Sequence, residues 1–246
     1  MKKKIPSLLL SAALAVSLLA GCGGNPSNND GSGSNAGPAK DTLVFSIPSE
    51  PTTLDATTAG ERITYLPVHA IHDTILAEGD NGEIVGNLVE SWEISEDNLT
   101  YTMKIREGVK FHQGQTMTVE DVMFSLQKST ENFAGRYSVI TNIEKVDDTH
   151  FKFTLAYPFS PVLNLLALTN ASVVCKETYE ANPEGYGRNP NGTGPFKFVS
   201  WMSGENIVLE RNDEWWKGEV PLKTLTFRII SEEATELIAL EAGDID

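Results

Sequence analysis

The stretch that decides the fold is Lys104-Ile105-Arg106-Glu107-Gly108-Val109-Lys110-Phe111-His112-Gln113-Gly114, which runs on into Thr118-Val119-Glu120-Asp121-Val122. Its first residues end a predicted strand, and its glycines are typical of turns. Thr118, followed three residues later by Asp121, predicts a capped helix start with an acidic first turn. The side chains that this helix is expected to bury are Val122, Leu126 and one of Met123 and Phe124.

Two elements are predicted between residue 42, where order is expected to begin, and residue 82. Residues 43–47 are mostly apolar and end at Pro48, which predicts a strand. Apolar residues then recur near helical spacing from residue 63 to 76, up to the turn signal at residues 79–82. This spacing predicts a helix in which Pro67 marks a start or a kink.

Three β-hairpins are predicted from short strands joined by turn-forming residues. They cover residues 91–95 with 100–105, residues 143–146 with 151–155, and residues 196–201 with 206–210. The other expected elements are a helix over 162–168, a strand near Val173, a strand over 222–230 and a helix over 232–241. Ser231 is the predicted cap of that last helix and Gly243 its end. Strands and helices follow one another along the chain without strict alternation, which favours an α+β or irregular α/β fold.

The first 41 residues are expected to direct export and to tether the folded part. Three lysines precede an apolar run, Leu8–Ala20, that is shorter than the roughly 20 residues of a membrane-spanning helix. Leu19-Ala20-Gly21-Cys22 resembles the lipobox of bacterial lipoproteins. We expect a signal peptide over residues 1–21, lipidation of Cys22, and a flexible linker over residues 22–41. An ordinary signal peptide that leaves Cys22 as a free thiol is the alternative.

Charge and cysteine content narrow the range of partners. The formal net charge is -15, and removal of the three leader lysines shifts it by -3 to about -18. An acidic surface argues against nucleic acid and anionic lipid headgroups as partners. Acyl chains would therefore hold the protein at the membrane. Cys175 is the only other cysteine, so no intramolecular disulfide is expected once Cys22 is acylated.

The sequence offers no convincing catalytic or metal-binding constellation. Cys175 lies in an apolar stretch with no histidine within twenty residues, which favours a buried, inert thiol. Neither a Gly-x-Ser-x-Gly elbow nor a Walker-type loop occurs. His69 and His72 lack a third ligand nearby, which favours structural roles over metal binding. We therefore expect no enzyme activity, no cofactor and no metal site.

Several motifs, in order along the chain, resemble those of the family-5 extracellular solute-binding proteins, which serve importers of dipeptides, oligopeptides, nickel and some other solutes. Beside the opening stretch, the matching segments are residues 51–55, 87–95 with 99–102, 192–198, 208–212 with Trp215-Trp216, and 240–246. Ala56 departs from the proline usual in the family after the first segment. Most aromatic and glycine residues of these motifs are expected to serve packing and turns.

The resemblance implies an α/β fold with mixed α+β character, of the periplasmic-binding-protein-like II type, whose two lobes close on a solute. Residues 42–246 would be its N-terminal part. Residues 42–75 and 192–246 would form the core of the first lobe, and residues 76–191 an inserted subdomain, with the second lobe absent. The loop after the first strand often faces the cleft in this family, which makes Glu50, Pro51, Thr52 and Thr53 the candidate ligand-binding residues.

The C-terminal segment predicts an interrupted element. Glu241–Asp246 contains a helix stop followed by what resembles the start of another strand. Members of the family are longer than this protein, so we expect the polypeptide to be cut short relative to its natural design. An apolar cleft face and an unfinished sheet would then be exposed.

The expected function is that of a substrate-binding lipoprotein of an ABC importer, at the extracytoplasmic face of the cell membrane. Its solute would be a di- or oligopeptide, delivered to the membrane permease and its ATPase. Two alternatives stay open. One is a receptor for a nickel chelate, an oligosaccharide or another solute on the same fold, and the other is a surface interaction protein built on a shortened lobe.

Overall fold

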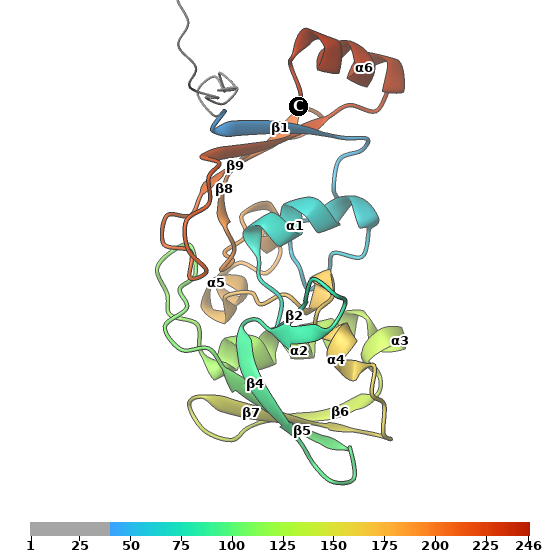
Figure 1. The fold of residues 1–246 in the computed structure, drawn as a ribbon, viewed down its shortest axis with the longest axis vertical. Coiled ribbons are helices and arrows are strands. Elements are labelled where there is room, and N and C mark those ends of the chain that lie inside the picture. The colour runs from blue at the N-terminus through green and yellow to red at the C-terminus, as the bar shows by residue number, and fades with distance from the viewer. Residues whose placement is uncertain (1–39) are drawn as a thin grey trace, which may run out of the picture. The chain divides into compact units, whose positions relative to one another are not determined.

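Two four-stranded sheets dominate residues 40–246, the part of the protein that the computed structural model describes (Figure 1). The first sheet has the strand order β1-β10-β9-β8, with β1 parallel to β10 and the other pairs antiparallel. The second has the order β4-β5-β7-β6 and is antiparallel throughout. Their strands are β1 (Thr42–Ile47), β10 (Thr224–Ile229), β9 (Asn206–Arg211), β8 (Phe196–Met202), β4 (Val89–Ile94), β5 (Thr100–Ile105), β7 (His150–Leu155) and β6 (Ile140–Lys145).

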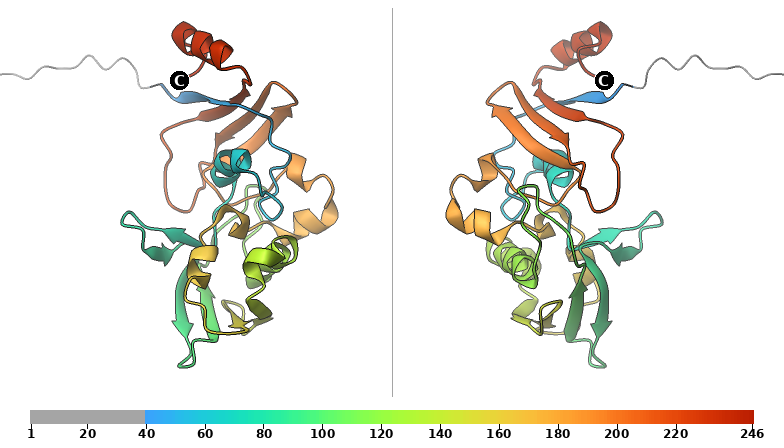
Figure 2. Two further views of the ribbon diagram at one scale, coloured as in Figure 1. Left: turned by 90° about the vertical axis from the view of Figure 1, so that its right-hand side faces the viewer. Right: turned by 90° about the vertical axis from the view of Figure 1, so that its left-hand side faces the viewer.

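Short helices and a small hairpin complete the described part. The α-helices are α1 (Tyr65–Ile71), α2 (Val119–Asn132), α3 (Ala134–Tyr137), α4 (Val162–Leu165), α5 (Lys176–Ala181) and α6 (Glu233–Ala242). Three 3-10 turns cover Arg62–Thr64, Thr169–Ala171 and Tyr186–Arg188, and β2 (Leu76–Glu78) pairs with β3 (Ile84–Gly86). Figure 2 shows α1 and α6 on opposite faces of the sheet that contains β1.

The second sheet follows from strict alternation of apolar residues. Tyr101, Met103 and Ile105 of β5 are buried, as are Phe151 and Phe153 of β7, while the residues between them face outward. The rings of Tyr101 and Phe153 stack with their centroids 5.0 Å apart. Helix α2 covers the buried face, and its capping box is confirmed: the Asp121 carboxylate accepts from the Thr118 N–H at 2.8 Å, and the Thr118 hydroxyl accepts from the Asp121 N–H at 3.3 Å.

Buried apolar side chains gather into two main clusters. The larger one draws on residues 75–175 and lies around the second sheet, α2 and α4. The other draws on residues 47–71 and 174–227 and lies between the first sheet and α1. The predicted division into a first-lobe core and an inserted subdomain remains a prediction. A small third cluster joins Val44 to Ile230, Ala239 and Ile245 beneath α6.

The strand that begins the ordered part, all three hairpins and the helix stop are confirmed. Gly243 adopts a left-handed φ of 76° at the end of α6, a conformation that glycine reaches without steric cost. The strand start predicted after it is reduced to one residue: the Asp246 N–H donates to the Val44 carbonyl at 2.9 Å, and the Asp246 carboxylate accepts from the Val44 N–H at 2.9 Å.

Four element predictions need correction. The helix predicted over residues 63–76 ends at Ile71, because the Ile75 N–H bonds the Ala171 carbonyl and Leu76 joins β2. The helix predicted over residues 162–168 ends at residue 165. The strand near Val173 reduces to one bridge between Thr74 and Ser172. Ser231 does not cap α6, since that helix begins one residue later than predicted and Glu232 occupies the cap position without a side-chain bond.

Candidate functional site

An apolar groove of about 670 Å³ opens between the end of β1 and the start of α1. One wall comes from β1 and the two residues after it, and the other from the 3-10 turn before α1 and the first turn of α1. The lining residues are Phe45, Ser46, Ile47, Pro48, Ser49, Arg62, Ile63, Tyr65 and Leu66. The two walls can be located in Figure 1, where β1 passes above α1.

Two large apolar side chains of this groove are open to solvent. Phe45 is 40% exposed and Leu66 is 53% exposed. Water contact with such side chains is unfavourable by roughly 25 cal/mol per Å² of apolar surface, so an occupant that covers them gains stability. A concave, mainly apolar surface with a few polar groups is the usual form of a small-molecule site.

The backbone of β1 adds hydrogen-bonding groups to the groove. Within residues 40–246 β1 has a strand partner on one side only, since it ends the sheet order β1-β10-β9-β8. The Val44 carbonyl accepts from Asp246 on the free side, whereas the Ile47 carbonyl accepts from Ile230 on the β10 side. Backbone groups alternate between the two edges along a strand, so the N–H and C=O of Ser46 point to the free edge. An extended ligand could pair with them.

Glu50, one of the predicted ligand-binding residues, is held by the protein itself. Its carboxylate accepts from the Ser203 hydroxyl at 2.7 Å, the Trp201 indole N–H at 2.8 Å and the Gly204 N–H at 3.1 Å. The Arg188 guanidinium lies 3.3 Å from it and 3.5 Å from the centre of the Trp201 ring. The bond from Ser203, with the others, holds the pKa of Glu50 below its ordinary value. Glu50 thus ties the loop after β1 to the β8–β9 turn.

The other three predicted residues also lie beside the groove rather than along its lining. Pro51 is buried, Thr52 is exposed, and the Thr53 hydroxyl accepts from the Asp55 N–H at 3.0 Å. The Leu54 N–H donates to the Gly187 carbonyl at 2.9 Å, which fixes the end of this loop. Contact between solute and Glu50, Pro51, Thr52 or Thr53 stays a prediction. Sequence reasoning missed Ile63 and Leu66 as lining residues, because apolar residues at helical spacing are expected on the buried face of a helix.

A second, polar hollow of about 440 Å³ surrounds the buried carboxylate of Asp73. One of its oxygens accepts from the indole N–H groups of Trp215 at 3.3 Å and Trp216 at 2.9 Å, and from the Thr193 hydroxyl at 3.1 Å. Lys217 approaches the other oxygen at 3.5 Å. These partners satisfy the carboxylate within the protein, so this cluster serves as a joint between segments distant in sequence.

His69, His72 and Cys175 are held by hydrogen bonds or by burial within the protein. The His72 ring is buried with Nδ1 3.2 Å from the Val173 carbonyl, and the His69 Nε2 lies 2.7 Å from the Thr169 hydroxyl. The predicted burial of Cys175 is confirmed, with 1% of the residue exposed. Across residues 40–246 no group of three or more His, Cys, Asp or Glu side chains is arranged to hold a metal ion.

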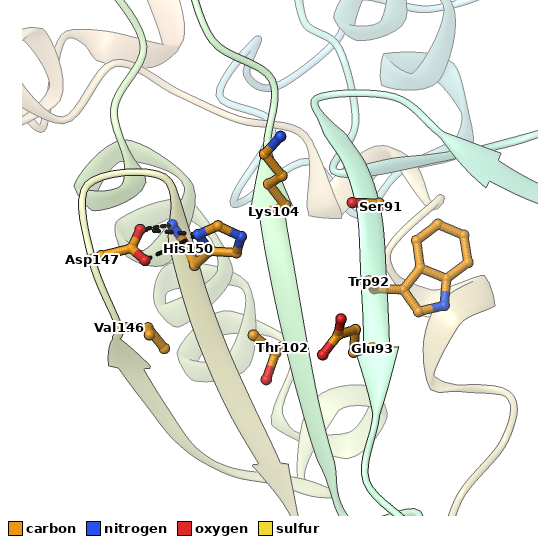
Figure 3. A pocket seen from close by; sticks show the side chains of 8 residues that line it. All are labelled: Ser91, Trp92, Glu93, Thr102, Lys104, Val146, Asp147 and His150. Carbon is orange, nitrogen blue, oxygen red and sulfur yellow. Dashed lines mark hydrogen bonds and ion pairs between the residues drawn. The ribbon is translucent and has the colours of Figure 1, made fainter.

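A smaller hollow of about 280 Å³ lies on the outer face of the second sheet. Figure 3 shows its side chains on β4, β5, β7 and the turn between β6 and β7, where Asp147 bonds to His150. The Asp147 carboxylate accepts from the Thr149 N–H at 2.8 Å and lies 3.0 Å from His150, contacts that hold its pKa well below its usual range. Lys104 pairs with Glu90 at 2.6 Å. Because Lys104, Asp147 and His150 already have partners within the protein, this hollow is a weaker candidate than the groove.

The described residues do not include the predicted signal peptide, Cys22 or most of the predicted linker. Within residues 40–246 no helix combines the length and the apolar character needed to cross a bilayer.

Comparison with known proteins gives a consistent picture. The family model for bacterial extracellular solute-binding proteins, family 5, matches residues 83–246. The sequence is 30% identical over 212 residues to a glutathione-binding protein of Pectobacterium atrosepticum, covering 84% of this chain and 41% of the relative. It is 28% identical over 261 aligned residues to the oligopeptide-binding protein AppA of Bacillus subtilis, covering 100% of this chain and 48% of the relative.

A solved structure of a binding protein has a similar fold. The binding protein MoaA of A. tumefaciens R10, in complex with mannopinic acid, superposes with a TM-score of 0.80 at 30% identity, covering 85% of this chain and 44% of that one. The superposition confirms the predicted mixed α/β fold of the periplasmic-binding-protein-like II type. The chain spans less than half the length of each of these three relatives.

Proposed function

The chain belongs to the bacterial extracellular solute-binding proteins, family 5, and from this membership we propose that it captures di- or oligopeptides for an ABC importer. The observation that carries the proposal is the apolar groove beside the free edge of β1. An extended peptide placed there would cover Phe45 and Leu66 and pair its backbone with Ser46. Two of the relatives are named for binding glutathione and oligopeptides, which supports a peptide solute.

In this proposal the groove is one wall of the binding site. The loop after β1, fastened to the β8–β9 turn through Glu50, keeps the groove open in one geometry. A rigid wall lowers the free-energy cost of ordering the site when solute binds. Closure of the protein around the solute would be driven by the additional contacts that the solute makes in the closed state.

We further propose that lipidation of Cys22 anchors the protein at the extracytoplasmic face of the cell membrane. The polar linker over residues 22–41 would let the folded part reach both free solute and the permease. Intact-mass measurement of the membrane-extracted protein tests this point. Two or more acyl chains on the mature N-terminus are expected, and a mature C22S protein that still partitions with membranes would contradict the anchor.

The binding proposal is tested by titrating the full-length protein with di-, tri- and tetrapeptides, with glutathione, with nickel–histidine and with an oligosaccharide, and following heat of binding. Peptides are expected to bind. Leu66→Asp puts a charge into the groove and is expected to weaken the affinity for peptides at least about tenfold, or 1.4 kcal/mol. Ile94→Asp is the matched control, because Ile94 is 43% exposed on the other sheet. Binding of nickel–histidine or the oligosaccharide alone would overturn the peptide assignment.

A further inference from the structure

Arg62 is the only charged residue among those that line the groove, whose other members are apolar side chains, a tyrosine and two serines. It belongs to the 3-10 turn that leads into α1 and is exposed. A single cation at an otherwise uncharged site determines the sign of the ligand that the site favours.

The guanidinium of Arg62 is also unengaged. Within residues 40–246 it makes no side-chain hydrogen bond, no ion pair and no contact with an aromatic ring. The other arginines of the described part all have partners: Arg106 lies over Trp216, Arg136 bonds Asn170, Arg188 pairs with Glu50, Arg211 with Asp213, and Arg228 with Asp244. The contrast matters because the protein is rich in carboxylates, with 34 Asp and Glu residues against 19 Lys and Arg.

We infer that Arg62 binds a carboxylate of the solute, so that the groove selects molecules that join an apolar portion to a carboxylate group. This inference rests on the proposed function and identifies the chemistry that the groove recognises. A guanidinium presents a planar fork of N–H donors that fits both oxygens of a carboxylate, and such bidentate pairs are among the stronger hydrogen-bonded contacts.

The position of Arg62 favours a paired carboxylate over a freely solvated one. Ile63 and Leu66 beside it and Phe45 opposite give the groove apolar walls, which exclude water when the groove is filled and so strengthen an ion pair. The net negative charge of the protein repels anions in general, so an anionic solute needs a local cation to be held. For a peptide lying along the free edge of β1, the carboxylate at the peptide's own C-terminus is the group that meets Arg62.

The test compares one apolar tripeptide, Ala-Leu-Phe, as its free acid and as its C-terminal amide, by titration calorimetry with the full-length protein. The wild type is expected to prefer the acid by about tenfold or more, because only the acid can form a charge-assisted pair with Arg62. Arg62→Gln is expected to reduce this preference to about twofold while leaving the affinity for the amide unchanged, and Arg62→Lys to keep part of it.

Lys110→Gln is the matched control, since Lys110 is exposed, lies outside the groove, and its replacement changes the net charge by the same amount. It is expected to keep the full preference. A wild-type protein that binds acid and amide equally, or an Arg62→Gln variant that keeps the wild-type preference, overturns the inference and leaves the receptor function standing. A wild-type protein that binds neither form overturns the proposed peptide function, and the inference falls with it.

Discussion

Acidification to pH 5 is predicted to destabilise the protein through His72. Burial, with a smaller contribution from the nearby His112, lowers the pKa of the His72 ring to about 3, against the pull of its bond to the Val173 carbonyl. An unfolded polypeptide holds the same ring at about 6.5. Between these two pKa values the ring is protonated in the unfolded state and neutral in the folded state. The free energy of unfolding therefore falls as the pH falls through 6.5.

The size of the effect follows from the same two values. At pH 7.5 the ring is neutral in both states and contributes no pH dependence. At pH 5 the unfolded ring is 1.5 pH units below its own pKa of about 6.5, while the folded ring is still neutral. At about 1.4 kcal/mol per unit, protonation of the unfolded state costs about 2 kcal/mol of stability.

Urea unfolding of the wild type and of His72→Asn, followed by tryptophan fluorescence at pH 7.5 and pH 5, measures the effect. Asparagine can still donate to the Val173 carbonyl but does not titrate, so the variant is expected to lose about 2 kcal/mol less than the wild type on acidification. Stopping at pH 5 keeps carboxylates such as Glu50, whose lowered pKa makes its contribution disappear only below about 4.5, out of the comparison. Equal losses in the two proteins would refute the reasoning.

Three substitutions test the packing of the described part by urea unfolding. Thr118→Ala removes the capping box of α2 and is expected to cost about 1 kcal/mol, so an unchanged midpoint would contradict the role of the cap. Gly192→Ala is expected to destabilise strongly, because its new Cβ would collide with the backbone oxygen of Ile71; Gly135→Ala, with nothing within 4 Å, should be neutral or slightly stabilising. Phe153→Ala should cost about 3–5 kcal/mol, and a loss below 1 kcal/mol would mean that the cavity collapses.

The parts of the fold that local pattern controls were predictable from the sequence. Alternation places Phe151 and Phe153 on one face of β7, whatever lies against that face. The cap at Thr118 and the stop at Gly243 depend on residues within one turn of the helix end, and both are confirmed. In each case the interaction that decides the structure lies within a few residues along the sequence.

The features that depend on distant partners were not predictable. Ile75 and Leu76 are buried, as a helical pattern requires, yet the Ile75 N–H bonds the Ala171 carbonyl and the backbone leaves the helix at Ile71. Burial is common to both structures, so periodicity cannot distinguish them. The candidate site shows the same limit: Glu50 is visible in the sequence as an acid in a loop, but its partner Ser203 lies 153 residues further on.

The buried joint at Asp73 explains how the groove can be rigid although it is built from short elements. Asp73 follows α1, whose first turn lines the groove, and it accepts from both Trp215 and Trp216. The ring of Trp216 in turn packs against the larger apolar cluster and under the Arg106 guanidinium, 4.7 Å from the ring centre. Movement of α1 against the second sheet would therefore break these part-buried hydrogen bonds and leave the buried Asp73 carboxylate without these partners, at a cost of about 1–3 kcal/mol. The groove wall that carries Arg62 is thus fixed before solute arrives, and ligand affinity need not offset the cost of ordering it.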